Sequence, residues 1–160
     1  MKCRRLTEKR LGQIFKDKGL IDQADIERAL RLQEENEGRY SFGAALMHLK
    51  LVEEEHILEG IVSQYKIPYF PADQYEIDLR AASLVPIEMA RAHSFVPVEK
   101  YGDVLTVLMA NPFKKGLIEE IESLCDAAVH VVLSKPSEIH RALDKVHEDI
   151  LVRQRAAAQN

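Results

Sequence analysis

Apolar and polar positions near the start of the chain recur with a fixed period. Gly12 and Gly43 are 31 residues apart, and so are Gln33 and Gln64. Between these markers, each copy repeats the same order of apolar residues, a short turn and a second apolar run. A repeat of this length is usually one supersecondary unit used twice. The pattern therefore predicts two copies of one unit, joined in tandem.

Within each copy, apolar residues fall at spacings of three and four, which predicts helices. The first helix covers residues 7–18 and stops at Gly19, where a left-handed backbone costs glycine little. Asp22 is a good N-cap for the second helix. Ser41 caps a third helix that reaches Leu49, and a fourth begins at the acidic run 53–55 and ends near Tyr65. These four helices predict two helical hairpins of one design.

After Pro68 and Pro71 the hydrophobic period changes. Two β-strand patterns flank a Tyr101-Gly102-Asp103 turn, which predicts a hairpin. The predicted elements are a short helix at 86–93, strands at 95–98 and 104–109, a helix at 114–124, a strand at 129–133 and a helix at 136–147. This order predicts an α+β fold, with repeated helical hairpins followed by a small α/β layer that contains a three-stranded sheet.

The change of period also suggests a domain organisation. We expect a helical repeat subdomain over residues 1–68 and a small α/β subdomain over 69–148. Residues 149–160 are polar and alanine-rich, and we expect a tail or linker there.

The chain of 160 residues has a formal net charge of −4, but the charge is uneven. Residues 1–20 contain seven basic and two acidic side chains. Two interpretations remain open: the first helix meets an anionic group, or it has a solvated basic face.

The two cysteines, Cys3 and Cys125, are too few for a disulfide framework and suit a reducing compartment. No stretch approaches the roughly 20 apolar residues of a membrane span, so we expect no membrane insertion. The basic start is not followed by the apolar core of a signal peptide. These features predict a cytoplasmic protein.

The sequence offers little for catalysis. It has no phosphate-gripping G-x-x-x-x-G-K-[ST] loop. Its six histidines are scattered, and His56 lacks a second histidine at ligand spacing. Cys125 lies in an apolar stretch and fits a core better than a nucleophile. We expect no catalytic residue, no metal site and no required cofactor.

The repeated segment resembles a known family. The residues that carry the resemblance are Arg10-Leu11-Gly12, Gly19-Leu20-Ile21, Ala29-Leu30 and Gln33, with their second copies, the link 64–70 and the later Asn111-Pro112. The pattern is similar to the N-terminal domain of type II secretion and type IV pilus assembly ATPases, the GspE N-terminal or MshEN family. The resemblance covers roughly residues 7–147. It departs at Asn111, where the family usually has Asp.

The resemblance implies two activities. Some family members bind cyclic di-GMP through both repeats, and others bind the cytoplasmic domain of an inner-membrane platform protein. The ATPase core that follows in full-length relatives is missing from this sequence, so the resemblance implies a non-catalytic regulatory and docking domain. Such a domain is recruited to the inner membrane through its partner.

The resemblance also implies ligand-binding residues for cyclic di-GMP. Arg10 matches the arginine that stacks on a purine and contacts phosphate, and Gln33 matches the glutamine that meets a guanine edge. The remaining matches are an apolar wall of Leu11, Leu20, Ile26 and Leu30, the close-approach Gly12, and the second-copy residues Ser41, Gly43 and Gln64, with Arg39 as a compensating arginine. The apolar wall also fits a hairpin core, and Gly12 also fits helix packing.

The second copy departs from the first in three positions. Ser41 stands where the first copy has Arg10, Lys50 replaces Gly19, and Gly60 replaces Ala29. The resemblance therefore predicts a weaker site than in relatives with two intact copies.

A DNA-binding protein built from helical hairpins is the alternative, because a basic first helix can suit a major groove. Against it, the second helix carries carboxylates that phosphates would repel: Asp22, Asp25, Glu27, Glu34 and Glu35. We therefore expect no nucleic-acid partner.

Overall fold

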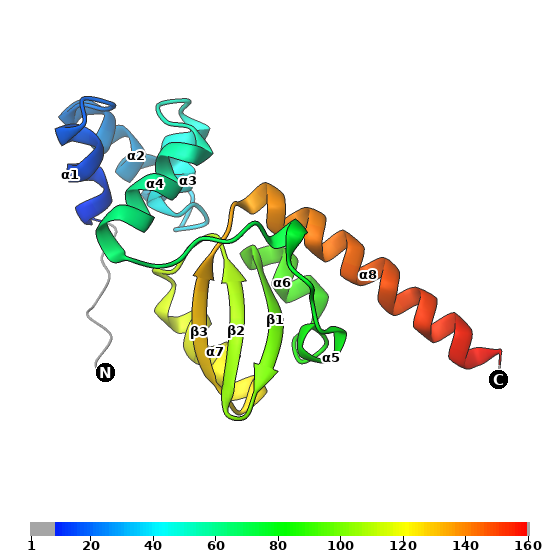
Figure 1. Ribbon diagram of the computed structural model, residues 1–160. Coiled ribbons are helices and arrows are strands. Elements are labelled where there is room, and N and C mark those ends of the chain that lie inside the picture. Colours follow the sequence, from blue (N-terminus) through cyan, green and yellow to red (C-terminus); the bar gives the residue numbers. More distant parts are fainter. Residues whose placement is uncertain (1–8, 160) are drawn as a thin grey trace. The chain divides into compact units, whose positions relative to one another are not determined.

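The computed structural model describes residues 9–159. The chain forms two compact units, Met1–Lys66 and Ile67–Asn160. The first unit is helical, and the second contains a three-stranded sheet with helices (Figure 1). The α+β fold predicted from the sequence is confirmed. Within residues 9–159, no helix is long and apolar enough to cross a membrane.

The helical unit contains α1 (Lys9–Asp17), α2 (Gln23–Glu35), α3 (Phe42–His48) and α4 (Glu54–Tyr65). All four predicted helices are present, and no strand occurs within residues 9–49. Helix α1 contacts α4, and α2 contacts α3. The two hairpins therefore pack crosswise, each supplying one helix to each contact. The buried apolar residues of the unit are Leu11, Phe15, Ile21, Ala29, Phe42, Ala45, Leu46, Val52 and Ile61.

The two copies share the way that their first helices end. In the first copy, the Gly19 N–H donates to the Lys16 carbonyl (3.0 Å) and the Leu20 N–H to the Phe15 carbonyl (2.9 Å). In the second, the same two bonds run from Lys50 to Met47 (2.9 Å) and from Leu51 to Leu46 (3.0 Å). This is the Schellman pattern, which satisfies carbonyls at a helix end. It recurs at an offset of 31 residues.

The second helices also begin alike. Asp22 is the N-cap of α2 and forms a capping box with Asp25, with N–H to carboxylate distances of 2.8 and 3.1 Å. Glu53 is the N-cap of α4, and its N–H donates to Nδ1 of His56 (3.1 Å). The predicted Asp22 cap is confirmed. Local sequence at equivalent positions therefore sets equivalent helix starts.

Three glycines allow the helices of this unit to approach closely. A Cβ at Gly12 would lie 3.1 Å from the Phe42 ring, and one at Gly43 would lie 3.3 Å from Ile57. At Gly60, a Cβ would lie 3.0 Å from both Leu11 and Phe15. The change from Ala29 to Gly60 between copies thus leaves room for two buried side chains of α1.

The second unit contains η1 (Ala72–Gln74), α5 (Leu79–Ala82), α6 (Ile87–His93), β1 (Phe95–Tyr101), β2 (Val104–Met109), α7 (Lys115–Cys125), β3 (Ala128–Leu133) and α8 (Pro136–Ala158). The sheet order is β1-β2-β3. Strands β1 and β2 are antiparallel, joined through Gly102 at φ 57°, as predicted. Strand β3 is parallel to β2, and the connection through α7 lies behind the sheet in Figure 1.

The core of this unit lies between the sheet and its helices. Leu105, Val107 and Leu108 are completely buried, and Ile121 of α7 and Ile139 of α8 join them. Helix α8 packs against β1, β2 and α6, and α7 packs against β3. The apolar residues Leu105, Val107, Leu108 and Met109 of β2 are therefore buried, each at most 1% exposed.

The structure corrects the sequence prediction in three places. The elements η1 and α5 were not predicted, because they are single turns without a measurable period. Strand β1 extends past Val98 to Tyr101. Helix α8 continues to Ala158, past the His147 where we expected it to end. Residues 148–158 contain no Gly or Pro and are rich in helix formers such as Ala, Arg and Gln, so nothing stops the helix.

Candidate functional site

The predicted ligand-binding residues divide by their exposure in the helical unit. Leu11, Gly12 and Gly43 are buried; Leu20, Ile26, Gln33 and Ser41 are half-buried; Leu30, Arg39 and Gln64 are exposed. Arg10 lies in α1, but its side chain is outside the part that the structure describes. Among these residues whose side chains the structure describes, a small molecule that approaches the unit can touch only the half-buried and exposed groups.

The buried members have clear packing roles. Leu11 is only 1% exposed and lies against Gly60 of α4. Gly12 faces the Phe42 ring and the Ile26 side chain, which would lie 3.1 and 3.6 Å from a Cβ. The alternative interpretation of these residues, as hairpin core and helix packing, therefore has direct support. They can shape a binding surface but contribute little contact area to it.

Two polar members already have partners within the chain. The Gln33 side-chain N–H donates to the Tyr40 carbonyl (2.9 Å), which fixes the loop between α2 and α3. The Ser41 hydroxyl accepts from the Ala44 N–H (3.1 Å) and caps α3, as the sequence predicted. Ser41 therefore supports the helix start, a role that an arginine at this position could not fill.

The exposed members offer the accessible chemistry. Leu30 is 44% exposed, and it is the one large apolar side chain of the helical unit, within the described residues, that is classed as exposed. Arg39 brings a guanidinium to the loop before α3, and Gln64 an amide to the end of α4. An apolar side chain held on a regular helix, beside half-buried Ile26, suits a flat aromatic ligand or a protein partner.

Sequence reasoning missed an aromatic pair near this loop. The rings of Tyr40 and His48 lie 5.3 Å apart, tilted by 33°. Tyr40 precedes the Ser41 cap and His48 is the last residue of α3. The two residues are about two helical turns apart. A search for apolar residues at helical spacing does not detect an aromatic pair of this kind.

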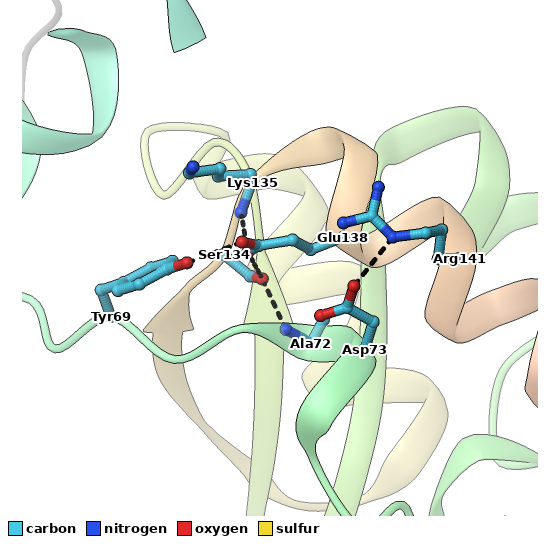
Figure 2. Close-up of polar contacts among 7 residues, drawn as sticks. All are labelled: Tyr69, Ala72, Asp73, Ser134, Lys135, Glu138 and Arg141. Atoms are coloured by element: carbon cyan, nitrogen blue, oxygen red, sulfur yellow. Dashed lines mark hydrogen bonds and ion pairs between the residues drawn. The ribbon is translucent and has the colours of Figure 1, made fainter. Parts of the chain in front are cut away.

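A second polar cluster, in the α/β unit, was also missed. Its centre is the buried carboxylate of Glu138, which accepts from the Tyr69 hydroxyl (2.6 Å), the Ser134 hydroxyl (2.9 Å) and the Lys135 N–H (3.1 Å). Figure 2 shows how residues of the segment 69–73 meet the start of α8 at this point. Because Tyr69 and Glu138 are 69 positions apart, no local pattern reveals the contact.

The environment of this cluster changes the acidity of Tyr69. Burial of the phenol, followed by its hydrogen bond to Glu138 and the negative charge of that carboxylate, raises the pKa of Tyr69 to about 12.

Burial also raises the pKa of the Cys125 thiol. Cys125 is a buried core residue, as predicted. Within residues 9–159, no group of His, Cys, Asp and Glu is arranged to hold a metal ion.

Comparison with known proteins identifies the family. Residues 65–151, more than half of the chain, match the MshEN domain. The chain therefore belongs to the MshEN domain family, and the resemblance found in the sequence is confirmed. The match covers the α/β unit, whereas the repeated motif lies in the helical unit.

Two relatives are type IV pilus assembly ATPases named PilB. The protein from Myxococcus xanthus is 25% identical over 140 residues, 88% of this chain and 24% of the relative. The protein from Thermus thermophilus is 28% identical over 145 residues, 89% of this chain and 16% of the relative. The chain thus spans a quarter or less of these relatives.

Two solved structures share the fold. The structure of MshE with cdg (cyclic di-GMP) has a TM-score of 0.68 and 22% identity, covering 85% of this chain and 97% of that one. The N-terminal domain of XpsE has a TM-score of 0.70 and 19% identity, covering 90% and 97%. The chain therefore has the α+β fold of the N-terminal domain of XpsE and shares it with MshE.

Proposed function

We propose that this chain is a non-catalytic regulatory and docking domain of a type IV pilus assembly or type II secretion ATPase. Membership of the MshEN family and the likeness to two PilB ATPases support this role. The absence of a phosphate-gripping loop from the sequence is consistent with it. In this proposal, the domain senses a ligand or a partner and leaves nucleotide hydrolysis to other parts of the machine.

The ligand that we propose is cyclic di-GMP, bound on the helical unit. The observation that carries the proposal is the exposed Leu30 on α2, beside half-buried Ile26, in a repeat that resembles MshE. Leu30 and Ile26, with Leu20, would form the apolar wall beneath a purine. Arg10 would stack on the base and reach a phosphate.

The polar residues take distinct parts in this proposal. Because the amide nitrogen of Gln33 already donates to Tyr40, its carbonyl oxygen would accept from a guanine edge. In the second copy, Arg39 would supply the guanidinium that Ser41 lacks, and Gln64 would meet the second base. Leu11, Gly12 and Gly43 would act through packing, as their burial indicates.

Isothermal titration calorimetry with cyclic di-GMP tests the ligand directly. We expect saturable binding to the chain, a loss of one to two decades of affinity in Arg10→Ala, and little change in Arg31→Ala. Arg31 is an exposed arginine of α2, so this control removes the same charge from the same unit. If titration with cyclic di-GMP up to about 100 μM gives no binding heat, the ligand proposal fails.

We also propose that the domain docks on the cytoplasmic domain of an inner-membrane platform protein. The exposed Leu30 and the exposed basic residues of the helical unit support a protein partner as well as a nucleotide. Biolayer interferometry with the purified cytoplasmic domain from the same organism tests this. Binding that weakens in Leu30→Asp but not in Glu27→Gln would support docking on α2, and no binding at any concentration would refute it.

A further inference from the structure

The segment that follows the helical unit is anchored on the α/β unit almost at once. We call residues 68–73 the connecting strand, although its last two residues are the first two of η1. The Leu133 N–H donates to the Pro68 carbonyl (2.7 Å) and the Phe70 N–H to the Leu133 carbonyl (2.9 Å), so this segment pairs with the end of β3. Helix α4 ends at Tyr65. Only Lys66 and Ile67 therefore lie between the last helical residue and the first anchored one.

Backbone pairing alone does not account for this anchoring. Two hydrogen bonds at a sheet edge return less free energy than ordering six residues costs in conformational entropy. A strand of this length, paired at a single residue, needs side-chain contacts to stay in place. The connecting strand obtains them from the start of α8.

The side-chain contacts converge on Glu138. Glu138 is only 7% exposed, and Ser134 beside it is 2% exposed. One carboxylate oxygen accepts from Tyr69 of the connecting strand, and the other accepts from Ser134. The Ser134 hydroxyl in turn accepts from the Ala72 N–H (3.0 Å). The carboxylate thus holds the connecting strand at two points, directly at Tyr69 and through Ser134 at Ala72 (Figure 2).

An ion pair joins the same two elements at the surface. The Arg141 Nε donates to Asp73 at 2.8 Å, and the two side chains are 60% and 27% exposed. Exposed pairs of this kind contribute little because water screens them. The buried Glu138 contacts, by contrast, cannot be replaced by water without opening the cluster. The ion pair therefore serves as a natural comparison for the buried carboxylate.

We propose that Glu138 is a clamp that keeps the tether between the two units at two residues. With the clamp closed, Lys66 and Ile67 span at most about 7 Å. Beyond the residues that Glu138 holds directly, the next anchor is Ala72, whose side chain is completely buried in the core. With the clamp open, the tether lengthens to residues 66–71, with a reach of about 20 Å. The clamp is therefore a device that switches the chain between a short and a long tether.

This device is independent of what the helical unit binds. A short tether holds a second binding event at high effective concentration, whereas a long one lowers it. If the helical unit binds a ligand as proposed above, the shortest path from that unit to α8 runs through the two tether residues, the connecting strand and its hydrogen bonds to Glu138 and Ser134. A failure of the ligand proposal leaves the clamp untouched, because its test uses no ligand.

Amide hydrogen exchange by NMR on the whole chain tests the clamp. In the unmodified protein, we expect protected amides at Phe70, Ala72 and Leu133, and an unprotected amide at Ile67. Glu138→Gln replaces one of the two accepting carboxylate oxygens with an amide NH2 group, whose hydrogens then face a hydrogen-bond donor. Exchange at Phe70 and Ala72 should therefore accelerate at least tenfold. The amides of β2 and of Leu20 and Leu51 should change less than twofold.

Two further variants make the outcome decisive. Tyr69→Phe removes one contact without a charge change and should accelerate Phe70 by an intermediate factor. Arg141→Gln, which removes the surface ion pair with Asp73 and leaves Glu138 in place, should leave Phe70 and Ala72 within threefold of the unmodified protein. Unchanged exchange at Phe70 and Ala72 in both Glu138→Gln and Tyr69→Phe would overturn the proposal. Equal acceleration of the β2 amides would also overturn it, since Glu138 would then act on global stability alone.

Discussion

Gly19 and Lys50 occupy the same left-handed backbone position at the ends of α1 and α3, with φ of 70° and 56°. Each donates its N–H to the carbonyl three residues earlier, and the next residue closes the Schellman pattern. The backbone of the repeat is therefore kept although the residue that suits it has been lost in the second copy. A lysine here carries strain that glycine avoids.

This strain predicts an asymmetric pair of substitutions. Lys50→Gly should stabilise the chain by about 0.5–1 kcal/mol, since relief of the left-handed strain exceeds the entropy that glycine adds to the unfolded chain. Gly19→Lys should destabilise it by about 1 kcal/mol. Urea unfolding followed by helical circular dichroism measures both. A destabilised Lys50→Gly would show that the lysine side chain makes an overriding contact.

Packing at Gly60 predicts a large effect from a small side chain. A Cβ there would lie 3.0 Å from the buried Leu11 and Phe15, so Gly60→Val should cost about 2–3 kcal/mol through overpacking. Gly116 is the matched control, because it is also helical and a Cβ there meets nothing within 4 Å. Gly116→Val should stay within about 0.5 kcal/mol of the parent. Similar melting temperatures for the two variants would contradict the close approach of α1 and α4.

The acidity of Tyr69 predicts a loss of stability at high pH. Its pKa is raised from 10.0 to about 12, so the folded state holds the phenolic proton more tightly than the unfolded state. The resulting stability is present below pH 10 and is lost as the pH rises toward 12. Urea midpoints should therefore fall more steeply over this range in the parent than in Tyr69→Phe. Ultraviolet titration that places every tyrosine near pH 10 would refute the prediction.

The cap at Ser41 complicates repair of the second ligand half-site. Ser41→Arg introduces the arginine of the first copy but removes the hydroxyl that caps α3, at a cost of about 1 kcal/mol. Adding Lys50→Gly offsets this loss. The double variant should therefore be as stable as the parent and bind cyclic di-GMP about tenfold more tightly. The control is Lys50→Gly alone. If the double variant binds no better than this control in calorimetry, position 41 does not contact the ligand.

Local signals explain what could be predicted from the sequence. Helix caps at Asp22 and Ser41, the glycine stop at Gly19 and the hairpin turn at Gly102 depend on residues within one turn of each other. The same holds for the apolar run of β2. Such features can be predicted because the backbone preference and its side-chain cause lie in the same few residues. The family motif is a string of such local features, so it too could be recognised.

The tertiary structure alone decided which residues of the motif are free to meet a ligand. Gln33 has the right chemistry for binding, yet its side-chain amide already donates to the Tyr40 carbonyl. Leu11 and Leu30 have the same side chain and fit the same apolar wall, but one is buried against α4 and the other is exposed. Burial depends on which helix packs on which face, and periodicity within one helix does not contain that information.

The sequence by itself determined the repeat, the longer helices, the three strands and the family. Only the tertiary structure brought Tyr69 and Ala72 to Ser134 and Glu138, across more than 60 positions of the chain. The reason is physical. A buried carboxylate is stable only when several donors surround it, and those donors come from whichever segments the fold brings together. A lone glutamate in the first turn of a predicted helix looks like an ordinary helix-start residue until the connecting strand lies beside it.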